Sequence, residues 1–144
     1  MKCLCATMRR SARLLTRYYE EEMRGAGLTP AQFEILAMLS ARGSISQCEL
    51  AEKVGVDQTT LSRNMKVLAG RRWITGGESA GDKRAVVYAL SGAGKKVLRA
   101  ALPHWRRAQD HMRGVLGSEW EMVWSSLERL GDVADAAMKS GAAG

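Results

Sequence analysis

The middle third of the chain constrains the fold most, because two short capped helices, a tight turn and a basic hairpin follow one another there. Ser46 and Glu49 have the spacing of a capping box, in which each side chain satisfies the other residue's free backbone N–H group. Gly55 is expected to end this first helix, and Asp57 is a good N-cap for a second one. The pattern therefore predicts a helix-turn-helix.

The second helix of this pair is predicted over residues 58–68, with a single apolar stripe. Leu61, Met65 and Leu68 recur at helical spacing and should face a core. The other faces carry amide, hydroxyl and cationic side chains, which are the groups that hydrogen-bond to base edges and phosphates in DNA. These candidate DNA-contacting residues are Gln58, Thr59, Thr60, Ser62, Arg63, Asn64 and Lys66.

Side-chain chemistry separates the roles within this set. Arg63 is the best candidate for a guanine edge, because a guanidinium can donate two hydrogen bonds to O6 and N7. Lys66 is expected to contact a phosphate. Ser46 and Gln47 are expected to do the same, since the N-terminus of a helix binds anions. For a hydroxyl residue such as Thr60, the alternative is that it only caps or solvates the helix.

Two segments rich in β-branched and aromatic residues, 73–75 and 86–90, flank a polar turn over residues 76–84. A helix-turn-helix followed by such a hairpin is a winged helix, which usually binds DNA. The net charge of +7 and the pI of about 9.7 favour a polyanionic partner. Between residues 57 and 84, six Lys or Arg residues oppose three acidic ones, so positive charge gathers where the fold requires it.

The rest of the chain is predicted to be helical, which gives a mainly α fold with a small β-wing and six helices. Helices are expected over residues 4–24 and 29–42, the second with a Thr N-cap followed by Pro. Residues 44–45 should form a short strand beside the wing. Ser91 should cap a long helix that ends near Val115, and Pro103 is expected to kink or break it.

The last predicted helix carries an apolar stripe that includes two tryptophans. A winged helix is too small to cover this stripe together with that of the first helix, and such surface is costly to leave in water. A symmetric homodimer of the terminal helices would bury both, although an intramolecular core is the simpler alternative. The candidate dimer residues are Leu4, Met8, Trp120, Trp124 and Leu127.

The chain is accordingly expected to be a single domain over residues 1–144. Residues 29–91 form its winged-helix part, and residues 1–28 and 92–144 form its dimerisation part. The sequence lacks an apolar run long enough for a membrane span or a signal peptide. Its three cysteines fit a protein of the reducing cytoplasm. We therefore expect a cytoplasmic protein with no membrane contact.

Other function classes receive little support from the residues. No phosphate-binding loop, paired-carboxylate motif or nucleophile elbow is present, so an enzyme is not expected. Cys3, Cys5, His104 and His111 are metal-ligand types, but they lack a compact ligand spacing. No metal site and no cofactor are therefore predicted.

Several motifs together resemble those of the MarR (multiple-antibiotic-resistance regulator) family of bacterial transcription factors. They are Leu28-Thr29-Pro30-Ala31-Gln32-Phe33, Glu49-Leu50-Ala51, Asp57-Gln58-Thr59-Thr60-Leu61-Ser62-Arg63 and Asp82-Lys83-Arg84 before Tyr88-Ala89-Leu90-Ser91. The resemblance covers nearly the whole chain. It implies that Arg84 enters the DNA minor groove while Asp82 orients it, with Lys83 between them.

One position departs from the family pattern. Family members usually have Gly where this chain has Arg72. Either Arg72 adopts an unfavourable backbone conformation, or Gly70 ends the recognition helix early.

The resemblance implies a homodimeric repressor that binds double-stranded DNA, but it does not identify the signal that controls this binding. One possibility is a small aromatic ligand between the dimer helices and the winged helix, near Arg13, Tyr18 and Trp105. The other is peroxide sensing by a thiol, because the first helix resembles that of hydroperoxide sensors. That resemblance implies that Cys5 reacts and that the partner subunit's Tyr19 assists it. The candidate effector residues are Cys3, Cys5, Arg13, Tyr18, Tyr19 and Trp105.

Overall fold

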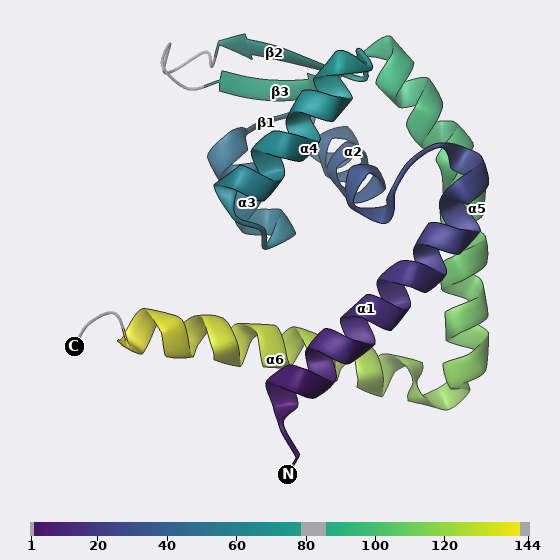
Figure 1. Cartoon of the computed structure of the whole chain (residues 1–144), viewed down its shortest axis with the longest axis vertical. Helices are drawn as coiled ribbons and strands as arrows, with labels where there is room; N and C mark the ends of the chain where they lie inside the picture. Colours follow the sequence, from purple (N-terminus) through teal and green to yellow (C-terminus); the bar gives the residue numbers. More distant parts are fainter. Residues whose placement is uncertain (1, 79–85, 142–144) are drawn as a thin grey trace. The chain divides into compact units, whose positions relative to one another are not determined.

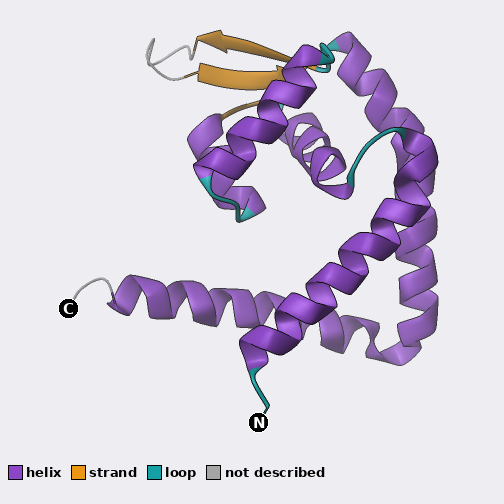
Figure 2. Ribbon diagram, in the orientation of Figure 1, coloured by secondary structure: helices purple, strands orange, loops and turns teal. Residues whose placement is uncertain are grey.

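The computed structural model describes residues 2–78 and 86–141, and it is mainly helical with one small sheet (Figures 1 and 2). The chain divides into two compact units, Met1–Ala108 and Gln109–Gly144. The helices are α1 (Leu4–Met23), α2 (Pro30–Arg42), α3 (Gln47–Val54), α4 (Gln58–Gly70), α5 (Gly92–Leu116) and α6 (Trp120–Gly141), with 3₁₀ turns η1 (Arg24–Ala26) and η2 (Gly117–Glu119). The strands are β1 (Ser44–Ser46), β2 (Ile74–Glu78) and β3 (Val86–Leu90).

Capping residues start α2, α3 and α4 where the sequence predicts. The Thr29 hydroxyl accepts the Gln32 backbone N–H at 3.2 Å, and the Gln32 side chain accepts the Thr29 N–H, so this capping box is complete. The Ser46 hydroxyl accepts from the Glu49 N–H at 3.2 Å, but the Glu49 side chain does not accept the Ser46 N–H in return, so the capping box predicted there is only half formed. Gly55 ends α3 with a φ of +71°, a conformation in which glycine avoids a steric penalty.

The sheet connects the winged-helix elements to one another. Its order is β1-β3-β2, and both pairings are antiparallel. Residues 44–45 do form a strand beside the wing, as predicted. The predicted turn over residues 76–84 was placed too early, because Gly76 and Gly77 lie within β2, paired to Tyr88 and Val87. Two glycines offer no side chain for pattern reading, but ladder hydrogen bonds to β3 hold them in the strand.

The core of the first unit lies among α2, α3, α4 and the sheet. The predicted stripe Leu61, Met65 and Leu68 of α4 is buried in it. Leu36 of α2 and Leu50 of α3 are fully buried against the same cluster. Since α4 presents one apolar side to this core, its polar sides face solvent.

Of the two outcomes predicted for Pro103, a kink or a break of the long helix, the break does not occur. Helix α5 continues from Gly92 to Leu116 with Pro103 inside it. Buried Leu98 and Ala101 precede the proline and buried Ala108 follows it, so packing favours one continuous helix despite the lost backbone hydrogen bond.

The second unit contains the end of α5, η2 and α6. Trp120 and Trp124 stack with ring centroids 5.8 Å apart. Among the described residues, α6 contains no buried residue, and the side chains of Trp124 and Leu127 are 48% and 44% exposed. The predicted apolar stripe is therefore left largely open within a single chain.

Candidate nucleic-acid interface

The N-terminus of α4 is fixed by Asp57. Its carboxylate accepts the Thr60 backbone N–H at 2.9 Å and the Thr60 hydroxyl at 2.6 Å. These hydrogen bonds hold the pKa of the Asp57 carboxyl below its usual value, so the N-cap is an anion at neutral pH. The Thr60 side chain is thereby engaged in the cap.

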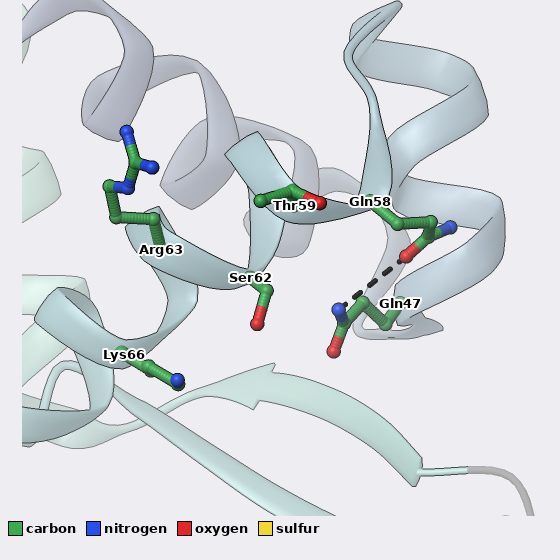
Figure 3. Close-up of a pocket in the computed structure, with 6 residues that line it drawn as sticks. All are labelled: Gln47, Gln58, Thr59, Ser62, Arg63 and Lys66. Atoms are coloured by element: carbon green, nitrogen blue, oxygen red, sulfur yellow. Dashed lines mark hydrogen bonds between the residues drawn. The ribbon is translucent and has the colours of Figure 1, made fainter.

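An open hollow of about 520 Å³ lies on the solvent side of this helix (Figure 3). Every side chain that lines it carries a hydrogen-bonding group, as expected of a surface that reads nucleic acid. The lining residues are Gln47, Gln58, Thr59, Ser62, Arg63 and Lys66, all of which the sequence had indicated as DNA contacts.

A chain of side-chain hydrogen bonds orients the two glutamines of this hollow. The Tyr88 hydroxyl donates to Gln47 Oε1 at 3.4 Å, and Gln47 Nε2 donates to Gln58 Oε1 at 3.5 Å. Figure 3 shows the two amides facing each other. The donor end of Gln58 is thus the end presented to a ligand.

Tyr88 is a residue that the sequence reasoning missed as part of the site. It lies on β3, where it pairs with Ile45 of β1, and Ile45 immediately precedes Ser46 and Gln47 in the chain. Only this strand register brings the tyrosine to the start of α3. A lone tyrosine 41 residues from its partner leaves no local signal in the sequence.

Three other predicted contacts serve the scaffold in this structure. Ser46 accepts the Glu49 N–H as the N-cap of α3, and Thr60 donates to Asp57. The Asn64 side-chain amide donates to the Thr60 carbonyl oxygen at 3.2 Å, within its own helix. The wing residues Asp82, Lys83 and Arg84 lie outside the described residues.

The C-terminus of α4 adopts the strained form that the sequence allowed for. Arg72 has a φ of +57°, in the left-handed region. The Trp73 N–H donates to the Leu68 carbonyl oxygen, and the Arg72 N–H donates to the Ala69 carbonyl oxygen. These two hydrogen bonds form a Schellman motif, in which Arg72 occupies the position that glycine usually fills. The Ser91 hydroxyl donates to the Arg72 carbonyl at 2.7 Å and holds this turn to the start of α5.

Arg71 connects the same end of α4 to the α1–α2 connection. Its guanidinium donates to the Gly27 carbonyl at 3.0 Å and lies 4.7 Å from the centroid of the Trp73 ring. The C-terminal end of α4 is therefore tied to the segment that leaves α1.

The candidate effector residues lie on α1 and α5, apart from Cys3, which immediately precedes α1. Tyr18 and Tyr19 of α1 contact each other edge to face, and Trp105 of α5 stacks on Phe33 at 5.6 Å. Partial burial raises the pKa of Tyr19, so its hydroxyl remains a donor at neutral pH. Arg13 is exposed.

The cysteines are accessible. Cys3, Cys5 and Cys48 are all free and exposed in the single chain. Within residues 2–78 and 86–141, no cluster of three or more metal-ligand side chains occurs. Among the same residues, no helix is both long and apolar enough to cross a membrane.

Comparisons with known proteins agree on one family. A family model described as MarR family matches residues 26–85. The M. tuberculosis transcriptional regulator MosR, solved in complex with DNA, is 34% identical with a TM-score of 0.85, covering 94% of this chain and 98% of that one. A probable transcriptional regulator from Pseudomonas aeruginosa is 26% identical with a TM-score of 0.81, covering 88% and 96%. Transcriptional regulator HosA of Escherichia coli is 26% identical over 102 residues, which is 71% of this chain and 76% of HosA.

Proposed function

This chain belongs to the MarR family of transcriptional regulators, and on that premise we propose that it is a cytoplasmic repressor that binds a pseudo-palindromic operator as a homodimer. The observation that carries the proposal is the open hollow over α4. Apart from Gln47 of α3, its amide, hydroxyl and cationic groups come from the exposed side of α4, whose other side is buried. A helix of this kind fits a DNA major groove.

The roles of individual residues follow from their chemistry. Arg63 contacts a guanine edge, and the donor end of Gln58 contacts a base acceptor. Lys66 contacts a phosphate and contributes affinity without sequence preference. The likeness to MosR, which was solved in complex with DNA, supports this use of the surface.

The wing supplies a second contact in this proposal. Arg84 occupies the minor groove, where Asp82 orients its guanidinium and Lys83 adds positive charge. An Arg84→Ala variant should lose about 1–3 kcal/mol of DNA binding without loss of the dimer. Asp82→Ala should have the same effect with a smaller magnitude.

The exposed apolar residues at both ends of the chain support the homodimer. Leu4 of α1 is 62% exposed, and α6 presents Trp124 and Leu127 to solvent. A second copy that covers these residues, together with Met8 and Trp120, buries surface that is costly in water. Two recognition helices related by a two-fold axis then match the symmetry of a palindromic site.

A salt titration of DNA binding tests the central role of α4. The logarithm of affinity should fall linearly with the logarithm of salt concentration, and Lys66→Ala should reduce the slope by about 1.8, because the dimer loses one phosphate contact, worth about 0.9, in each subunit. Lys96→Ala removes an exposed lysine of α5 and should leave the slope unchanged. Equal slopes for wild type and Lys66→Ala would remove α4 from the interface.

The proposal also covers the signal that releases the protein from DNA. We assign release to a small aromatic ligand bound between the dimer helices and the winged helix, near Arg13, Tyr18 and Trp105. The exposure of Cys3 and Cys5 at the start of α1 favours oxidation of a thiol as the second candidate.

Peroxide separates the two candidates. Under thiol control, peroxide releases wild type from DNA, Cys5→Ser stays bound, and Cys48→Ser behaves like wild type. The exposed Cys48 on α3 is the matched control for a nonspecific thiol reaction. Equal responses of wild type and Cys5→Ser would leave the aromatic ligand as the signal.

A further inference from the structure

A second open hollow, of about 340 Å³, lies where the α1–α2 connection meets the end of α4. We call it the junction hollow. Its lining includes Glu20 of α1, Arg24 of η1, Thr29 and Gln32 at the start of α2, and Arg71 directly after α4. Its volume is at the lower end of the range of about 300–1,000 Å³ that is usual for small-molecule pockets. Its described lining residues include neither a candidate effector residue nor a candidate DNA contact.

A buried amide donor opens to the junction hollow. Gln32 is only 8% exposed, and its Oε1 accepts the Thr29 backbone N–H at 3.2 Å, so the capping box uses the oxygen of the amide and leaves the nitrogen unused. No described residue accepts a hydrogen bond from this nitrogen. Because no fully enclosed side-chain polar atom of the described residues lacks a partner, the Gln32 N–H groups reach the hollow that Gln32 lines. A donor at such a site is costly to leave without an acceptor.

Two opposite charges border the junction hollow without pairing. The Arg71 guanidinium donates to the Gly27 carbonyl at 3.0 Å, which uses one of its five N–H groups and holds the side chain in place. Among the ion pairs of residues 2–78 and 86–141, none includes Arg71 or Glu20, whereas Arg24 pairs with Glu21. The hollow therefore offers one cation and one anion that no other described residue neutralises.

The start of α2 adds a further donor beside Arg71 and Gln32. The Thr29 hydroxyl accepts the Gln32 backbone N–H at 3.2 Å, so its own hydrogen is available to a ligand. The N-terminus of a helix also favours negative charge. Donors thus gather around Arg71 and the start of α2, while Glu20 supplies an acceptor.

We propose that the junction hollow binds a free α-amino acid. The carboxylate of the ligand accepts hydrogen bonds from the Arg71 guanidinium and the Gln32 amide, and its ammonium group donates to Glu20. Hydrogen bonds between charged groups are the strong ones, and a zwitterion forms them with both unpaired charges at once. A phosphate or a simple carboxylic acid would satisfy Arg71 but would be repelled by Glu20.

Binding is tested on the full chain without DNA, so the result is independent of whether the protein binds an operator. Each standard L-amino acid is added to nitrogen-15-labelled protein, and the side-chain amide signal of Gln32 is followed by NMR. At least one amino acid should shift this signal in a saturable way. The carboxylic acid that lacks only its amino group, and inorganic phosphate, should bind about fivefold more weakly or worse.

Two substitutions locate the ligand, with affinities measured by calorimetry. Gln32→Glu keeps an acceptor for the Thr29 N–H, because Glu also completes a capping box, but it replaces the donor with a negative charge and should weaken binding about tenfold or more. Glu20→Gln should weaken the amino acid about two- to fivefold while strengthening the acid that lacks the amino group. Glu52→Gln, the same change at an exposed residue of α3, is the matched control and should leave both affinities unchanged.

The opposite responses to Glu20→Gln separate recognition of a zwitterion from a general disturbance of the fold. A structural effect would weaken both ligands alike, and that result would contradict the proposal. The proposal is also wrong if no amino acid shifts the Gln32 signal, or if phosphate binds as tightly as the amino acid, which would indicate a simple anion site. Should Gln32→Glu fail to fold, Glu20→Gln still decides, because Glu20 is exposed and outside the core.

Discussion

Replacing Arg72 with glycine should stabilise the protein, although it removes a charged side chain. Arg72 has a φ of +57°, which costs an L-residue about 1–2 kcal/mol. Glycine adopts this conformation without that penalty but loses about 0.5–1 kcal/mol through the greater freedom of the unfolded chain. The difference predicts a net gain of about 0.5–1 kcal/mol for Arg72→Gly.

Urea denaturation of three variants measures this effect. Arg72→Ala keeps the unfavourable φ and should change the free energy of unfolding by less than about 0.5 kcal/mol. Ala69→Gly, at an exposed position inside α4, should lower the free energy of unfolding by about 1 kcal/mol, because glycine there only increases the conformational freedom of the unfolded chain. The reasoning fails if Arg72→Gly is no more stable than Arg72→Ala at equal protein concentration.

Three further predictions follow from contacts in the structure. Gly94→Ala should destabilise the protein by about 3 kcal/mol in thermal or urea unfolding, because the added carbon would overlap the Trp73 carbonyl oxygen, whereas Gly92→Ala meets no atom and should have little effect. Tyr88→Phe should weaken operator binding by about 1 kcal/mol while leaving nonspecific affinity and the salt slope unchanged, and an equal loss on both DNAs would refute the orienting role. The pKa of Asp57 is lower in the folded protein than in the unfolded chain, so the stability that Asp57 contributes is present above the unfolded pKa and is lost as the pH falls through the folded pKa. The free energy of unfolding of Asp57→Asn should therefore depend less on pH in the acidic range than that of wild type.

Local sequence signals were sufficient to predict most elements of the winged helix. Thr29, Ser46 and Asp57 act as N-caps because the hydroxyl or carboxylate needs only backbone N–H groups two or three residues away. The stripe of α4 needs only helical periodicity to be recognised, and the exposed residues of the hollow follow as its complement. A site built on one side of one helix is therefore largely readable from sequence.

Features that depend on distant residues could not be read in this way. The continuity of α5 through Pro103 depends on packing before and after the proline, which local propensity does not contain. Tyr88 reaches Gln47 only through the register of β1 with β3. The strain at Arg72 was foreseen as one of two options, and only the backbone conformation decides between them.

The most direct test of the account is selection of bound sequences from random DNA duplexes, followed by hydroxyl-radical footprinting of the enriched site. We predict a pseudo-palindrome protected by two subunits, with half-site centres about one helical turn apart. Arg63→Ala should relax the base preference within each half-site without moving the protected region. Failure to enrich any sequence, or protection of a single half-site by one subunit, would contradict the central claim.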